Sequence, residues 1–300
     1  STPYIADTLE CDIKETAYYS ASELNGMRRK ASDALSLART VRREKEPRKD
    51  YNYYILKEPV TENPFYISAS VTTKEQYKAL YDAGLSRIYA PLSFAEEVGA
   101  YAGILDAVFD ENKILSASRI IAGSLGAYSY SKKAGKLTSA DYSMNIFNSV
   151  SALALDFEFV TLSPELSLRQ CMDISSYAKT EAIAYGYLPL MKIGNCIVNA
   201  AGECKQKRCA GCDKEIKLKD RKGAIFKIKS DGKMNILYNS VPIFMADKLN
   251  EIKSAGIGGV RLSFTFESPV ECAKIYLMFK ENKKIEFPKS FTRGHFYRGF

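Results

Sequence analysis

From residue 59 onward, short β-like runs alternate with amphipathic segments of helical period. This alternation constrains the fold more than any other feature of the sequence. Phe65–Val71 has the composition of a strand, and Thr73–Ala83 repeats its apolar residues at helical spacing. Such alternation predicts an α/β domain with a parallel sheet and helices outside it. Six or more units in this region favour a TIM-barrel-like (β/α) barrel, with an open doubly wound sheet as the alternative.

Further units continue the pattern to the end of the chain. Ser93 with Glu96, Ser163-Pro164 and Ser268-Pro269 each have the composition of a helix start. No glycine-rich phosphate-binding motif follows a strand, so the sequence does not support a nucleotide-binding version of the fold. The expected strands are 87–92, 119–122, 159–162, 182–185 and 259–264, and the expected later helices are 144–154, 163–178, 248–255 and 268–280.

Residues 1–58 do not share this pattern. Apolar residues recur at helical spacing over Ser22–Arg43, and a charged, proline-interrupted stretch follows. We therefore expect 1–58 to be the helical and linker tail of a preceding accessory domain, and 59–300 to be the barrel domain. The chain begins at Ser1 without Met, which predicts a piece of a longer or processed protein. No apolar run approaches the ~20 residues that span a bilayer, so we expect no membrane partner.

Residues 189–238 interrupt the alternation. They contain four of the seven cysteines, in the spacing C-x7-C-x4-C-x2-C, and then a hairpin pattern in which Ile225–Lys229 alternates, Asp231-Gly232 turns and Met234–Tyr238 returns. The segment is therefore predicted to be a Cys-rich β-hairpin insertion after a central strand. In barrels the loops that follow strands build the functional site. The clustered cysteines are Cys196, Cys204, Cys209 and Cys212.

Clustered thiolates in a reducing cytoplasm, the expected location, indicate a metal site rather than disulfides. Zinc and an iron–sulfur cluster both suit such ligands, and the spacing does not choose between them. Lysines and arginines around the cluster would lower the thiol pKa values. The other three cysteines, Cys11, Cys171 and Cys272, are isolated and are expected to be buried apolar residues.

A single histidine, His295, restricts the possible chemistry. It excludes an HExxH metalloprotease, and any hydrolase with a histidine base must use this residue. The net charge of +8 is a mild bias toward polyanions. Eleven basic and four acidic residues lie between Lys205 and Lys233, so much of the excess falls on the insertion.

Five stretches of the chain stand out: Glu181–Met191 with Asn195-Cys196, Leu218–Gly223, Leu162–Leu166, Thr292–Gly299, and Ser22–Asn25 with Arg28-Arg29. Together they resemble peptidase family U32, the collagenase-like proteases, and specifically the C-terminal half of its long members. The last stretch resembles the end of the accessory domain that precedes that half. The resemblance covers nearly the whole chain. It implies a TIM-barrel-like fold, a bacterial or archaeal cytoplasm, and in several relatives a 4Fe–4S cluster on four cysteines. Some relatives hydroxylate a pyrimidine in tRNA or rRNA with prephenate as co-substrate, and others act in ubiquinone hydroxylation.

One departure is that Tyr185-Gly186 stands where the first-half barrel of such proteins carries His-Gly. This copy is therefore expected to support, rather than perform, the chemistry. The main expectation is an RNA base hydroxylase. The alternatives are a peptidase, which the family name implies, and a non-catalytic, zinc-stabilised module that binds RNA or a partner.

The candidate residues follow from these hypotheses. Asp141, Asn145, Asn148 and Glu165 lie where strands lead into helices, so they are expected at the barrel mouth, with His295 as a further catalytic candidate. Tyr187, Phe296 and Tyr297 are candidates for stacking on an unpaired base. The residues expected to contact RNA phosphates are Lys205, Lys207, Arg208, Arg221, Lys222, Arg293 and Arg298.

Overall fold

The computed structural model describes residues 4, 8, 10, 12, 18–40, 60, 64–106, 116–195, 197–200, 202, 216–230, 234–282 and 284–298. The chain divides into two compact units, 1–52 and 53–300. The first unit holds the helix α1 (Ala21–Thr40), which has no buried residue. Its apolar side chains Leu24, Met27 and Leu37 are exposed within this unit.

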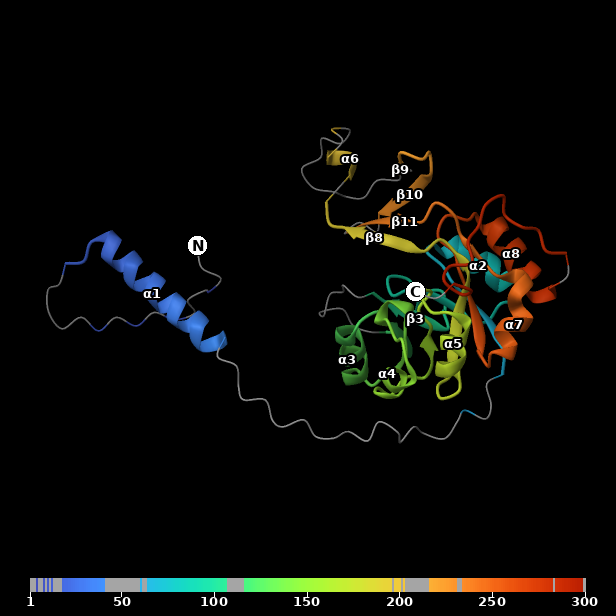
Figure 1. The fold of residues 1–300 in the computed structure, drawn as a ribbon, viewed down its shortest axis with the longest axis horizontal. Coiled ribbons are helices and arrows are strands. Elements are labelled where there is room, and N and C mark those ends of the chain that lie inside the picture. The colour runs from blue at the N-terminus through green and yellow to red at the C-terminus, as the bar shows by residue number, and fades with distance from the viewer. Residues whose placement is uncertain are drawn as a thin grey trace. The chain divides into compact units, whose positions relative to one another are not determined.

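The second unit is a closed barrel of eight parallel strands. Seven of them pair in chain order from β1 to β7. The strand β13 lies between β7 and β1 and closes the ring. This closure confirms the TIM-barrel-like fold over the open sheet (Figure 1). The strands are β1 (Tyr66–Ser70), β2 (Ile88–Pro91), β3 (Ala102–Leu105), β4 (Arg119–Ala122), β5 (Leu137–Ala140), β6 (Val160–Thr161), β7 (Thr180–Gly186) and β13 (Gly259–Ser263).

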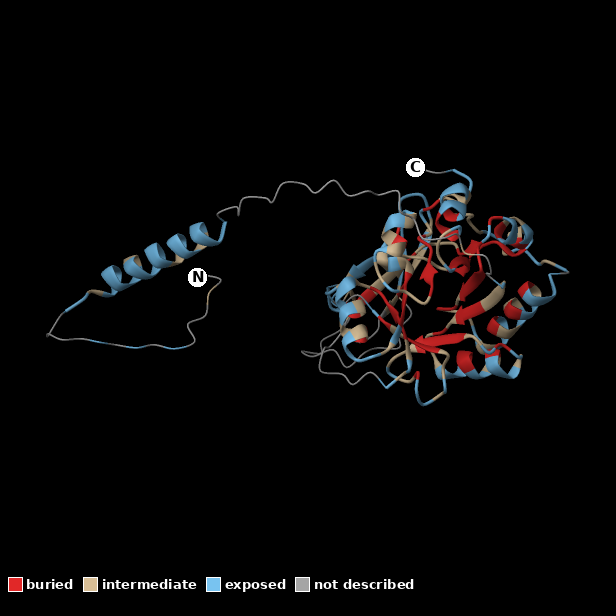
Figure 2. Cartoon of the chain, turned by 90° about the horizontal axis from the view of Figure 1, so that it is seen from below, coloured by how far each residue is buried: buried red, intermediate tan, exposed pale blue. Residues whose placement is uncertain are grey.

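Helices surround the barrel with one face toward the strands. Figure 2 shows buried strands at the centre and helices whose outer faces are exposed. The last helix begins as the sequence predicts: Ser268 and Glu271 form a capping box, with Pro269 at the first turn. The helices are α2 (Lys74–Asp82), α3 (Leu125–Lys133), α4 (Ser149–Leu153), α5 (Leu168–Ser175), α7 (Leu249–Ser254) and α8 (Pro269–Glu281), with 3-10 turns η1 (Tyr142–Met144) and η2 (Ala246–Lys248).

Three predicted helix starts are wrong. The helix α4 begins at Ser149, after its cap Asn148, rather than at residue 144. Residues 92–99 form turns, not a helix, and Gly99 has a φ of +67° that ends the last of them. The helix α5 begins after Ser167 rather than at Ser163-Pro164. Ser167 and Gln170 form a capping box there, so the first helical N–H groups find their partners four residues later than expected.

The insertion forms its own antiparallel sheet, with strand order β8-β11-β10-β9. The predicted hairpin is its centre, formed by β10 (Ile225–Ser230) and β11 (Asn235–Tyr238). The outer strands are β8 (Pro189–Ile193), which follows β7 closely, and β9 (Ile216–Lys219). We call these four strands the insertion sheet. A short helix, α6 (Ile197–Ala200), follows β8, and a short strand, β12 (Ile243–Phe244), pairs with the end of β7.

No helix among the described residues is long and apolar enough to cross a membrane.

Candidate functional site

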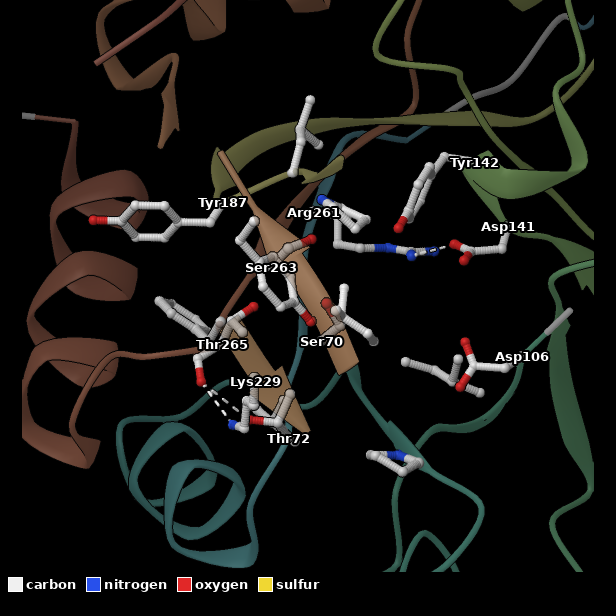
Figure 3. A pocket seen from close by; sticks show the side chains of 18 of the residues that line it. Ser70, Thr72, Asp106, Asp141, Tyr142, Tyr187, Lys229, Arg261, Ser263 and Thr265 are labelled. Atoms are coloured by element: carbon white, nitrogen blue, oxygen red, sulfur yellow. Dashed lines mark hydrogen bonds and ion pairs between the residues drawn. The ribbon is translucent and has the colours of Figure 1, made fainter. Parts of the chain in front are cut away.

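A cavity of about 370 Å³ lies at the carboxyl end of the barrel, between the strand ends and the insertion sheet. We call it the mouth cavity. The barrel contributes residues at or just after the ends of β1, β5 and β13, and the insertion sheet contributes residues of β8, β10 and β11 (Figure 3). Its volume is in the range of small-molecule sites. Its polar lining includes Ser70, Thr72, Asp106, Asp141, Tyr142, Lys192, Lys229, Arg261 and Ser263.

Arg261 of β13 joins the mouth cavity to the barrel interior. Its side chain is 2% exposed. Its Nη1 donates to Asp141 Oδ1 at 2.7 Å, and its Nε donates to Glu181 Oε1 at 2.7 Å. One buried cation therefore fixes two carboxylates from different parts of the chain, one on β7 and one just after β5.

Glu181 is fully buried and has donors around both oxygens. Thr161 donates to its Oε1 at 3.0 Å, whereas Ser68 and Tyr89 donate to its Oε2 at 2.8 and 3.0 Å. The donors come from β6, β1 and β2, and Arg261 comes from β13. A buried charge is costly without such partners, so this network stabilises one arrangement of the barrel interior.

The network changes the proton affinity of its members. Burial raises the pKa of Asp141 above its ordinary value, although Arg261 opposes the shift. Burial alone would lower the pKa of Arg261, but Glu181 and Asp141 outweigh it and raise the pKa. Asp141 therefore lines the cavity and holds its proton to a higher pH than an ordinary aspartate does. That is the property of a general acid.

The insertion sheet turns one face toward the mouth cavity. Lys192, Ile236 and Lys229 are neighbours in register on three adjacent strands, so their side chains share this face. All three line the cavity. Further along β10, Lys227 lies 4.9 Å above the ring of Phe266, which follows β13. Tyr238 of β11 packs edge-on against the same ring at 5.1 Å. These contacts hold the sheet over the barrel.

A second cavity, of about 420 Å³, lies beside the first. Tyr142, Leu188 and Pro189 line both and form the wall between them. The structure brings three of the predicted catalytic candidates together here, whereas Asp141 lines the mouth cavity. The three are Asn145, Glu165 and His295.

Other predicted site residues have structural partners. Asn148 caps α4 through Ser151, so its amide serves the helix. Arg293 pairs with Asp247 at 2.6 Å and donates to the carbonyl of Phe244, also at 2.6 Å. Phe296 packs against the core, and the Tyr297 hydroxyl donates to Glu251.

The remaining residues predicted to contact RNA are either exposed or outside the described part of the chain. Arg221 and Lys222 are exposed on the turn between β9 and β10, and Arg298 is exposed near the C-terminus. Lys205, Lys207 and Arg208 lie outside the described residues, as do Cys11 and all four clustered cysteines.

The predicted metal site therefore lies outside the part of the chain that the structure describes. Within that part, no group of three or more His, Cys, Asp or Glu residues could hold a metal ion. Cys171 and Cys272 are free and buried as expected. Burial raises the pKa of each thiol to about 12, so both are unreactive at neutral pH.

Sequence reasoning missed Arg261, Glu181 and Lys229 as members of a site. A signal for the first two was present, because each is a charged residue inside an otherwise apolar strand run. Lys229 gave no such signal. Lysine at alternate positions of a hairpin is typical of a solvated face.

Comparison with known proteins does not place the chain in a family. No family model matches it, and no curated protein matches it. Three solved structures are similar at low level. The spore cortex-lytic enzyme SleL of Bacillus megaterium QM B1551 is 13% identical with a TM-score of 0.35, over 76% of each chain.

The two other structures are equally distant. A chitinase from Chromobacterium violaceum ATCC 12472 is 10% identical with a TM-score of 0.34, over 74% of this chain and 99% of that one. SleL of Bacillus cereus is 12% identical with a TM-score of 0.35, over 75% and 76%. At these values the likenesses assign neither family nor activity, so the site itself has to indicate the function.

Proposed function

We propose that the mouth cavity is the active site of a barrel enzyme that uses Asp141 as a general acid. The observation that carries this proposal is the hydrogen bond from Arg261 to Asp141, at 2.7 Å, on the wall of a cavity at the carboxyl end of the strands. The carboxyl end is where barrel enzymes place their chemistry. The arginine fixes the orientation of the carboxyl group, and burial keeps it protonated more readily than in water.

We further propose that the substrate is a base in RNA, as the resemblance to peptidase family U32 implies. The supporting feature is the outer edge of the insertion sheet, which we call the basic edge. It consists of four exposed cations on β9 and the following turn. Cations spaced along an edge suit the phosphates of an RNA strand. The four are Lys217, Lys219, Arg221 and Lys222.

The four clustered cysteines are proposed to hold a 4Fe–4S cluster, with zinc as the alternative. The segment that bears the cysteines connects β8 to β9, the two edge strands of the insertion sheet, because Ile193 pairs with Asn235 and Ile216 pairs with Ile228. Thiolates are ligands for both groups. A bound cluster would supply electron transfer, and prephenate and the N-terminal half of the same protein are proposed as co-substrate and partner.

RNA binding tests the basic edge. We expect the full chain to bind a structured RNA with an affinity that falls steeply with salt. Replacement of Lys217, Lys219, Arg221 and Lys222 by Gln should weaken binding. It should also flatten the slope of log K against log[salt] by about 0.7–0.9 for each phosphate that the variant no longer neutralises. Lys78→Gln is the control, because this exposed lysine of α2 lies outside the insertion sheet and should leave binding unchanged. Equal binding by the edge variant and the wild type would contradict an RNA role for this edge.

Metal content separates the proposed function from the two alternatives. Protein purified without oxygen should contain iron and sulfide, and Cys209→Ser should lose both while Cys171→Ser retains them. One tightly bound zinc and no iron would favour the non-catalytic module. Cleavage of casein that disappears in His295→Ala would favour the peptidase. Protein that binds no metal in either form would reject the cysteine site.

A further inference from the structure

We propose that Lys229 is a nucleophilic amine that forms an imine with a small aldehyde or 2-oxo acid bound in the mouth cavity. This inference rests on the proposed function only in placing chemistry in that cavity, and it requires neither RNA nor a metal. Lys229 reaches the cavity from β10 of the insertion sheet, opposite the carboxyl ends of β1 and β13 (Figure 3).

The hydrogen bonds of Lys229 suit a neutral amine. Its Nζ lies 2.7 Å from Thr72 Oγ1 and 2.8 Å from the carbonyl oxygen of Thr265. Thr72 is itself fixed, because its hydroxyl also lies 3.2 Å from Gln76 Oε1. A neutral amine has two N–H groups and one lone pair. The two acceptors match the two N–H groups of a neutral amine, whose lone pair is then available for attack.

The charges around Lys229 favour the same form. Among the described residues, no carboxylate lies within 4.0 Å of its Nζ. Glu267 is the acidic group whose field reaches it. That carboxylate already accepts the Tyr185 hydroxyl and the N–H groups of Thr265 and Phe266. Burial therefore prevails and lowers the pKa of Lys229. A desolvated lysine without a carboxylate partner is the usual form of an imine-forming lysine.

The other lysine that lines the cavity differs in these respects. Lys192 lies 3.6 Å from Asp106 Oδ1, and its side chain is 39% exposed. A cation of this kind suits the carboxylate of a 2-oxo acid rather than attack on its carbonyl carbon. The face of the insertion sheet thus presents one amine and one cation to the same cavity, and both are register neighbours of Ile236.

The chemical step is balanced without an additional reagent. The lone pair of Lys229 Nζ attacks the carbonyl carbon, the C–N bond forms, and one amine proton moves to the carbonyl oxygen. The second amine proton then leaves with that oxygen as water, and the C=N bond forms. Asp141, which also lines the cavity, is a carboxyl group whose pKa burial raises, so it can relay the proton to the departing oxygen.

Reductive trapping tests the inference on the full chain. The protein is incubated with glyoxylate or pyruvate and sodium cyanoborohydride, and the modified residue is located by peptide mapping. We expect Lys229 to carry the adduct and to be labelled faster than Lys192, because burial lowers the pKa of Lys229 and so increases its fraction of free amine. The adduct should be absent in Lys229→Arg and present in Lys192→Arg.

The outcomes separate this inference from the proposed function. Labelling confined to Lys229 supports it. Labelling spread over surface lysines, or faster at Lys192, overturns it, and so does no labelling by either reagent in protein whose thermal unfolding is cooperative. Should RNA binding and metal content fail while Lys229 is labelled, the imine site would stand and the RNA function would not.

Discussion

Two of the arginines in the barrel, Arg261 and Arg87, have opposite surroundings, one toward each end of the barrel. Arg261 reaches the carboxyl end, where Asp141 and Glu181 neutralise it. Arg87 precedes β2 at the amino end, and aromatic rings surround it: its guanidinium lies 3.7 Å from the ring centroid of Tyr66 and 4.6 Å from that of Tyr101. Tyr89 links the two, because its hydroxyl accepts from Arg87 and donates to Glu181.

The different surroundings of Arg87 and Arg261 distinguish a part of the barrel that only stabilises the fold from a part that can take part in chemistry. Ring faces stabilise a cation without providing a group that can exchange a proton, so we infer that the aromatic cluster around Arg87 stabilises the fold and takes no part in chemistry. Carboxylates beside a cavity provide such a group, and their cost of burial is offset only by an accurately placed partner. The same side chain therefore indicates a site at one end of the barrel and packing at the other.

Replacing each arginine in turn should give the largest difference in stability between the two ends of the barrel. Arg261→Met leaves Asp141 and Glu181 buried without their cation, so we expect the free energy of unfolding to fall by about 3–5 kcal/mol. Arg87→Met removes the cation from the aromatic rings together with one hydrogen bond, which should cost about 1–2 kcal/mol. Urea denaturation measures both. A decrease from Arg87→Met as large as that from Arg261→Met would contradict the distinction between the two ends.

Removal of the Tyr89 hydroxyl, which links the two arginine sites, should have a smaller effect on stability. Tyr89→Phe removes the hydroxyl that bridges Arg87 and Glu181, and we expect the free energy of unfolding to fall by about 1–2 kcal/mol. The double variant with Arg87→Met should be less destabilised than the sum of the two single variants by about 0.5 kcal/mol or more. Strict additivity would mean that the hydroxyl does not couple the two arginine sites.

The pH dependence of stability should reveal the raised pKa of Asp141. A carboxyl group whose folded pKa is raised stabilises the fold below its ordinary value of 3.8 and loses that contribution as pH rises. Wild-type stability relative to Asp141→Asn should therefore fall as pH increases above about 4. Glu251→Gln is the control of opposite sign, because hydrogen bonds from Lys248 and Tyr297 lower the pKa of Glu251. If the stability of wild type relative to each variant changed with pH in the same direction, the raised pKa of Asp141 would be contradicted.

The sequence predicted the repeating part of the fold well. The strand 119–122 and the capped start of α8 lie where the residues indicate, because these signals are local. The strands β3 and β5 were missed, since four-residue runs such as Ala102–Leu105 are too short to establish a period. Closure of the ring is visible only in the pairing of β13 with β1, which are separated by most of the domain.

The candidate site was predicted only in part, for a related reason. Asp141 was found because it lies just before the predicted helix 144–154, in a region where a strand leads into a helix. Its partner Arg261 lies 120 residues away, and only the closed barrel brings the two within 2.7 Å. In the insertion sheet the alternation was visible, but Lys229 of β10 lines the cavity at the barrel mouth rather than facing solvent. Periodicity identifies two faces and does not say which one another element covers.

The nucleosides of cellular RNA show most directly whether RNA is modified in the mouth cavity. The source organism would be compared with strains in which the gene is deleted or replaced by Asp141→Asn or Arg87→Met, and the nucleosides would be measured by mass spectrometry. We predict that one nucleoside heavier by a single oxygen atom disappears on deletion and in Asp141→Asn and remains in Arg87→Met. An unchanged nucleoside profile on deletion, or full modification in Asp141→Asn, would contradict modification in this cavity.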